Sequence, residues 1–237
     1  MKRFLKILIK ILSALILLGF LVFGILYAIY NEPLPEGRPG PAAEAMAEKM
    51  LKTINNEAYK NTRFMEWSYA GGAHTYKWDK ENGKVTVRWN DYIVHLNLND
   101  TSKSVVSDLN KQLSGKEASE VISTAWNYFN NDSFWLVAPF KVFDKGTNRS
   151  VVSLADGSEG LMVSYTQGGT TPGDSYLWKL DANGFPESYQ MWVKIIPIGG
   201  IASTWEGWQA MESGVFLPTA HKLGPITLGM GEVKAYN

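Results

Sequence analysis

The sequence predicts a mainly β (α+β) protein that carries one transmembrane helix at its N-terminus. Two features lead to this prediction: an uncharged run begins at Ile11, and most of the chain beyond Tyr30 alternates apolar and polar residues. Alternation with a period of two, broken by Asn-Gly and Asp-Gly turns, is typical of antiparallel sheets with one buried face. Two further segments have the apolar spacing of amphipathic helices, so helices are expected to cover the sheet.

The first 30 residues predict a membrane anchor. As a helix, the uncharged run from Ile11 to Tyr30 is about 30 Å long, which matches the hydrocarbon core of a bilayer. Four basic residues and no acidic ones precede it, which predicts a cytoplasmic N-terminus and a periplasmic or otherwise extracytoplasmic main domain. A cleaved signal peptide is the alternative, but its apolar region would be shorter and would end in small residues. Because the run ends in Tyr27-Ala28-Ile29-Tyr30, we assign residues 1–30 to a cytoplasmic tip and an uncleaved anchor.

Charge and cysteine content exclude several functions. The chain has 23 basic and 23 acidic residues, and the first 30 residues hold four of the basic ones, so the remainder has a net charge of −4. That region lacks the basic surface that nucleic-acid binding requires. The absence of cysteine rules out disulfides, thiolate catalysis, cysteine-ligated zinc and a lipid-modified N-terminal cysteine.

A linker and a helix are expected to follow the anchor. Residues 31–41 (NEPLPEGRPGP) are rich in Pro and Gly and predict an extended spacer. Apolar residues then recur three and four positions apart, which predicts a helix from Ala42 to Asn56. Residues 42–237 are expected to form a single β domain.

A second helix is expected to interrupt the strands. Ser114 and Glu117 match the S-x-x-E capping box at its start, and Asn130-Asn131-Asp132 is expected to end it, with strands resuming at Phe134. We count about eleven strand-like runs in the whole chain. That many antiparallel strands curl under their own twist into an incomplete barrel, with the helices lying across its concave face.

The order of these elements resembles that of the bacterial LolA/LolB lipoprotein carriers. The likeness is carried by the first helix, Phe64–Asp79 (FMEWSYAGGAHTYKWD), Pro172–Asp181 (PGDSYLWKLD) and Met191–Gly200 (MWVKIIPIGG). In that family an incomplete eleven-stranded barrel holds the acyl chains of lipoproteins and passes them between membranes. The resemblance implies the same barrel here, with a hydrophobic ligand in its concave face. A chain with a retained anchor and no cysteine is not expected to shuttle freely.

One face of the predicted sheet is rich in aromatic residues. A cavity lined by such side chains would suit an acyl chain, because aromatic rings combine a large apolar surface with a polar tip. The alternative is a dry core packed against the two helices. The candidate ligand-binding residues are Trp67, Tyr69, Tyr76, Trp78, Trp89, Tyr176 and Trp178.

Catalytic and metal-binding patterns are weak in this sequence. His74 shares the parity of the aromatic face, so we expect a buried structural histidine, with a general base as the alternative. His95 is expected to face solvent, and the spacing of these two and His221 matches no zinc motif. Asp156–Gly160 (DGSEG) departs from the G-x-S-x-G nucleophile elbow at its first position. No metal and no cofactor are expected.

These observations favour a non-enzymatic module that binds an acyl chain or another lipid-like ligand at the outer face of the membrane. Its expected role lies in lipid or lipoprotein handling. A hydrolase that uses His74 with a nearby carboxylate stays open as an alternative, as does a structural or protein-docking component of a cell-envelope complex. The sequence names no protein partner.

Overall fold

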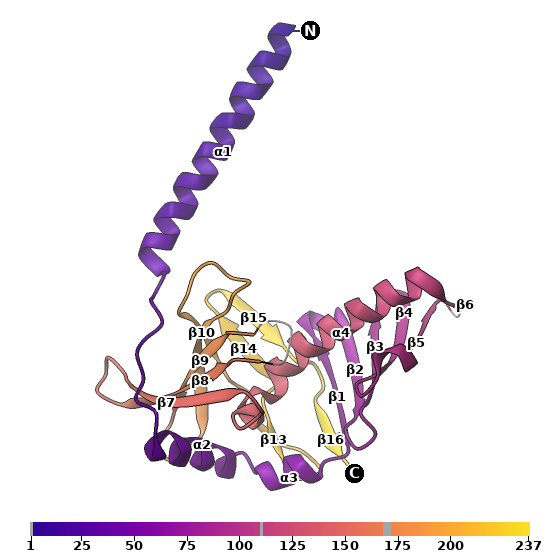
Figure 1. Ribbon diagram of the computed structural model, residues 1–237, viewed down its shortest axis with the longest axis vertical. Helices are drawn as coiled ribbons and strands as arrows, with labels where there is room; N and C mark the ends of the chain where they lie inside the picture. Colours follow the sequence, from indigo (N-terminus) through magenta and orange to yellow (C-terminus); the bar gives the residue numbers. More distant parts are fainter. Residues whose placement is uncertain (1, 110, 168–171) are drawn as a thin grey trace.

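The N-terminal helix stands apart from the rest of the chain in the computed structural model, which describes residues 2–109, 111–167 and 172–237 (Figure 1). This helix, α1 (Lys2–Tyr30), has no buried part from Phe4 to Tyr30 and is long and apolar enough to cross a membrane. Length and composition of this kind are shared by membrane anchors and signal sequences.

The segment after α1, which we call the strap (Asn31–Arg38), is held against the domain. The backbone N–H of Glu32 donates to the carbonyl oxygen of Gly199 at 3.0 Å, and Arg38 forms an antiparallel bridge with Val151. The Pro/Gly-rich spacer is therefore extended, as its composition indicates, but it is bound at both ends. The contact between Glu32 and Gly199 requires glycine at position 199, since a Cβ there would lie 2.7 Å from the carbonyl oxygen of Glu32.

Two open antiparallel sheets make up most of the domain. The seven-stranded sheet has the order β16 (Lys234–Tyr236), β1 (Phe64–Tyr69), β2 (His74–Asp79), β3 (Lys84–Trp89), β4 (Tyr92–Asn97), β5 (Val105–Asp108) and β6 (Lys111–Gln112). The five-stranded sheet has the order β11 (Ile201–Thr204), β10 (Pro186–Trp192), β9 (Ser175–Leu180), β8 (Glu159–Tyr165) and β7 (Thr147–Ser153). Two ribbons complete the set, β12 (Gln209–Ala210) with β13 (Phe216–Leu217) and β14 (Ala220–Leu223) with β15 (Ile226–Gly229).

The predicted fold class is confirmed, with differences in strand number and arrangement. The described residues form sixteen strands, where the sequence indicated about eleven, because several are only two to four residues long. The two sheets share no strand and neither closes into a barrel.

Helices cover these sheets from two directions. The predicted first helix (Ala42–Asn56) corresponds to α2 (Pro41–Thr53), and a further short helix, α3 (Asn56–Asn61), follows it as a separate element, since Asn55 between them has a left-handed backbone with φ 58°. Helix α2 packs on β7, and α4 (Gly115–Val137) lies against β4 and β5 before it runs across the domain (Figure 1). Buried residues from both sheets and from α2 and α4 form one continuous hydrophobic core.

The second helix differs from its prediction at both ends. Ser114 is its N-cap residue, but the side chain makes no capping hydrogen bond, so the predicted box with Glu117 does not form. The helix also continues through Asn130-Asn131-Asp132 to Val137, and Phe134 is helical. Those polar residues have weak helix propensity, which tertiary contacts override here because Asp132 is buried and hydrogen-bonded to the seven-stranded sheet.

Candidate functional site

The C-terminal half of α4 and the five-stranded sheet line a partly open cavity of about 470 Å³. Residues from α4, from strands β8 to β10 and from the loop after β10 line it, together with Trp78 from β2 and Leu98, which follows β4. Its volume lies in the range typical of small-molecule sites, roughly 300–1,000 Å³.

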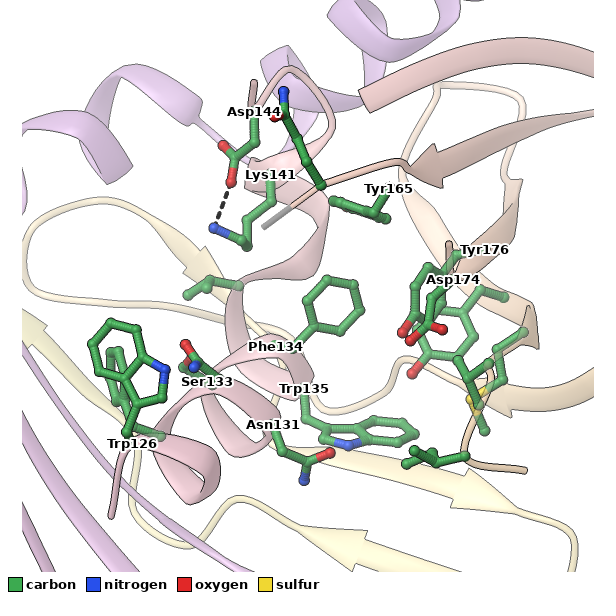
Figure 2. Close-up of a pocket in the computed structure, with 18 of the residues that line it drawn as sticks. Trp126, Asn131, Ser133, Phe134, Trp135, Lys141, Asp144, Tyr165, Asp174 and Tyr176 are labelled. Atoms are coloured by element: carbon green, nitrogen blue, oxygen red, sulfur yellow. Dashed lines mark ion pairs between the residues drawn. The ribbon is translucent and has the colours of Figure 1, made fainter. Parts of the chain in front are cut away.

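Aromatic side chains form the walls of this cavity. The ring of Phe134 lies 4.7 Å from that of Tyr176 and 5.6 Å from that of Tyr165, measured between centroids (Figure 2). One position further along α4, the Trp135 ring lies 5.7 Å from the ring of Tyr189. These edge-on and tilted contacts fix the walls while leaving apolar surface toward the space between them.

Charged groups lie at two places in the lining of the cavity. Lys141, which follows α4 in the 3-10 helix η3 (Ala138–Lys141), forms an ion pair with Asp144 at 2.5 Å, drawn as a dashed line in Figure 2. Immediately before β9, Asp174 is buried, and its Oδ1 accepts a hydrogen bond of 3.0 Å from the backbone N–H of Lys194. This bond ties the loop after β10 to the cavity wall.

Four of the lining residues carry buried polar atoms without a hydrogen-bond partner in the described part of the chain. They are Trp78 Nε1, Asn130 Nδ2 and the hydroxyl groups of Tyr165 and Tyr189. Burial raises the pKa of both tyrosines well above the usual value, so both hydroxyls keep their protons. All four atoms are therefore hydrogen-bond donors, and a donor that is buried and unpaired costs about 1–3 kcal/mol.

The predicted aromatic face is divided between the cavity and the core. Register places Trp67 opposite Tyr76 on one face of the seven-stranded sheet, and their rings stack at 4.6 Å. Trp178 is fully buried, with its ring 4.9 Å from that of Trp205. Of the seven candidates, Trp78 and Tyr176 line the cavity, Trp67, Tyr76, Trp89 and Trp178 are buried in the core, and Tyr69 is half-buried beside His74. Their role in ligand binding stays a prediction.

Several lining residues were not among the sequence candidates. Trp126, Phe134 and Trp135 come from α4, and Val193 and Ile196 from the loop after β10. A signal for the first group exists, since apolar residues continue at helical spacing beyond Phe129. For Phe134 and Trp135 this signal is hidden by Asn130-Asn131-Asp132, whose polar residues predict a helix end.

A buried carboxylate lies next to the cavity at Asp132. Its Oδ2 accepts hydrogen bonds from the hydroxyl of Tyr76 at 2.5 Å and from Nδ1 of His74 at 2.7 Å. The His74 ring also stacks on that of Tyr128 at 3.9 Å. His74, the first residue of β2, is thus held against α4 and is half-buried where the sequence predicted burial, while His95 is exposed, as expected. The described residues contain no group of three or more His, Asp or Glu that could hold a metal ion.

Comparisons with known proteins place the chain in no characterised family. No family model matches the sequence, and no curated protein matches it. Among solved structures, the chain is similar to a DUF1329 family protein from Desulfovibrio piger, with a TM-score of 0.39 and 9% identity. That alignment covers 81% of this chain and 92% of the other. A similarity of this size carries no argument about function.

Proposed function

We propose that this protein is a membrane-anchored, non-enzymatic binding module that holds an acyl chain or a comparable lipid-like ligand at the outer face of the membrane. The observation that carries the proposal is the aromatic-walled cavity between α4 and the five-stranded sheet. The LolA/LolB resemblance of the sequence points to the same class of ligand. Helix α1 acts as the retained anchor in this proposal.

The energetics of the cavity suit a single acyl chain. Each methylene removed from water contributes about 0.8 kcal/mol, so burying about ten of them matches the free energy of micromolar binding before the cost of immobilising the ligand. The unpaired donors of the lining add a chemical preference. An ester or carboxylate oxygen accepts hydrogen bonds, so a ligand with such an oxygen at one end of its chain would satisfy donors such as Tyr165 and Tyr189.

Photo-crosslinking tests the proposal on the full-length protein in lipid nanodiscs. A fatty acid that carries a diazirine should label peptides from the C-terminal half of α4 and from β9 and β10. The labelling should saturate and should fall when unlabelled fatty acid is added. Peptide mapping by mass spectrometry gives the positions.

A matched pair of variants on α4 controls this experiment. Ser133 is buried and lines the cavity, so Ser133→Phe should fill part of it and reduce labelling. Ser119 is exposed on the same helix, so Ser119→Phe should leave labelling unchanged. Labelling confined to α1, or equal labelling in both variants, would contradict the proposal.

A hydrolase is the second candidate. His74 and Asp132 are hydrogen-bonded in the way that a general base and the carboxylate that orients it would be. Within the described residues no serine or threonine hydroxyl hydrogen-bonds to His74, which is why binding is the first proposal. Release of fatty acid from a panel of ester substrates by the wild type, and its loss in His74→Gln with normal folding, would favour the enzyme.

A further inference from the structure

We infer that one end of the five-stranded sheet rests on the lipid surface of the membrane that anchors the protein, so that ligand enters the cavity directly from that bilayer. The contact surface is an apolar rim, defined here as Ile195, Pro197, Pro225 and Ile226, all of them exposed. This inference rests on the proposed function for the ligand and for α1 as a retained anchor.

The strap fixes the position of the first half of the rim. Only Asn31 separates the end of α1 from Glu32, which hydrogen-bonds to Gly199. The side-chain oxygen of Asn31 also accepts a 2.8 Å hydrogen bond from the backbone N–H of Gly199. Because two extended residues span at most about 7 Å, the loop Val193–Gly200 lies at the level where the apolar helix ends. That level is the interface between hydrocarbon and head groups.

A side-chain hydrogen bond reinforces this attachment. Trp192 Nε1 donates to the carbonyl oxygen of Glu32 at 2.8 Å, immediately before the loop begins. The strap therefore contacts both ends of the loop, at Trp192 and at Gly199. Two such contacts hold the loop close to the end of α1.

The second half of the rim lies at the same end of the sheet. Strand β14 runs antiparallel to β11, since Glu206 bridges to Ala220 and the Lys222 N–H donates to Thr204 Oγ1 at 2.9 Å. The tip of the β14–β15 ribbon is therefore level with Ile201, where the loop ends. Figure 1 shows this ribbon and the loop after β10 on the side of the domain that faces α1.

Exposure and position together indicate lipid as the partner of this surface. The side chains of Ile195 and Ile226 are 71% and 64% exposed, which is costly in water and favourable in a membrane interface. The exposed Lys194 lies beside Ile195, where its ammonium group can reach lipid phosphates.

The rim also borders the cavity. Ile195, Ile196 and Leu223 line the cavity as well as belonging to the loop and to the ribbon. An acyl chain that leaves the bilayer at the rim would therefore meet the cavity lining without crossing water.

Single-cysteine labelling tests the contact on the full-length chain, which contains no native cysteine. The variants Ile195→Cys and Ile226→Cys are each labelled with an environment-sensitive fluorophore. The labelled proteins are then reconstituted into vesicles of phosphatidylethanolamine and phosphatidylglycerol. Ala182→Cys is the control, because Ala182 is exposed in the turn at the opposite end of β10, about 20 Å away. Nitroxide-labelled lipids should quench the fluorophore at both rim positions and not at the control. Quenching equal to that of the control at both rim positions would overturn the inference.

Loading of the cavity is measured separately. The double variant Ile195→Asp/Ile226→Asp should slow transfer of the diazirine fatty acid from donor vesicles severalfold, whereas Ala182→Asp should not. Unchanged transfer in the double variant would contradict entry at the rim. If no variant, wild type included, is labelled in the cavity, the proposed function fails, and the quenching result still decides whether the rim contacts lipid.

Discussion

Asp132 joins α4 to the seven-stranded sheet through hydrogen bonds with His74 and Tyr76. We expect His74→Ala to lower the free energy of unfolding by about 1–3 kcal/mol, because it removes a partner from a buried carboxylate. Photo-crosslinking by the fatty-acid probe should stay measurable. Urea denaturation gives the stability, with His95→Ala as the exposed control. Loss of a hydrolytic activity at unchanged stability would instead make His74 catalytic.

His221 makes the stability of the domain depend on pH. It is fully buried, its Nδ1 lies 3.1 Å from the carbonyl oxygen of Thr204, and burial lowers its pKa to about 4. The unfolded state, with a pKa of about 6.5, binds the proton more tightly, so stability falls as pH decreases through this window. The loss from this residue approaches about 3 kcal/mol near pH 4.

Thermal unfolding between pH 7 and pH 5 checks this prediction, since most carboxylates stay ionised in that range. His221→Asn keeps a donor toward Thr204 and removes the titration, so its stability should vary less with pH than that of the wild type. An identical pH dependence in the two proteins would assign the effect to other groups.

Trp178 and Trp78 distinguish core from cavity. Trp178 is fully buried in the core, so Trp178→Ala should cost about 3–5 kcal/mol of stability. Trp78 is half-buried and lines the cavity, so Trp78→Ala should cost less and should change labelling by the fatty-acid probe. The comparison needs denaturation and crosslinking on both variants. A large loss of stability in both variants, with labelling unchanged in Trp78→Ala, would mean that the cavity lining is packed core and binds no ligand.

At the scale of elements, α4 begins without side-chain capping. Because the Ser114 side chain makes no capping bond, Ser114→Ala should cost no more than about 0.5 kcal/mol, where a working cap is worth about 1 kcal/mol. Asn55→Ala is the comparison, since the Asn55 side chain accepts a hydrogen bond from the Ala58 N–H at the start of α3. Asn55→Ala should cost more than a cap alone, because it also removes a bond to Gly214 and places alanine at a positive φ. A loss of about 1 kcal/mol or more for Ser114→Ala in chemical denaturation would show that Ser114 caps α4 in solution.

Local patterns predicted most strands and the start of α4, and failed where tertiary contacts decide. Hairpin turns at Asn82-Gly83 and Asn90-Asp91 join β2 to β3 and β3 to β4, as their turn residues indicate. The C-terminal part of α4 was missed because Asp132 is stabilised by side chains more than 50 positions away. Since that part forms one wall of the cavity, the sequence found only Trp78 and Tyr176 among the lining residues.

At the scale of the whole molecule, the role of α1 decides where the domain works. A reporter that is active only outside the cytoplasm, fused after Asn237, should be active, because the basic flank of α1 predicts a cytoplasmic N-terminus. The protein should stay in the membrane fraction at full length, as seen by intact-mass measurement. Recovery of a soluble form that lacks about 30 N-terminal residues would identify α1 as a signal sequence.

The division into two sheets lies beyond sequence patterns. Alternation predicts that a segment is a strand and which of its faces is buried, but it contains no information on distant partners. The pairing of Phe64 with Tyr236 in β1 and β16 is an example. The cavity depends on how the two sheets and α4 are placed relative to one another, so local sequence patterns could not predict it either.

That pairing has a consequence for biosynthesis. The hydroxyl of Tyr236 donates to Glu66 across 170 positions of sequence, so β1 leaves the ribosome long before its neighbour on that side exists. Until β16 arrives, one edge of β1 presents unpaired backbone groups, which are open to pairing with other chains. The seven-stranded sheet can therefore be completed only after β16 has been synthesised. Folding of this domain would benefit from a chaperone that shields β1 during that interval.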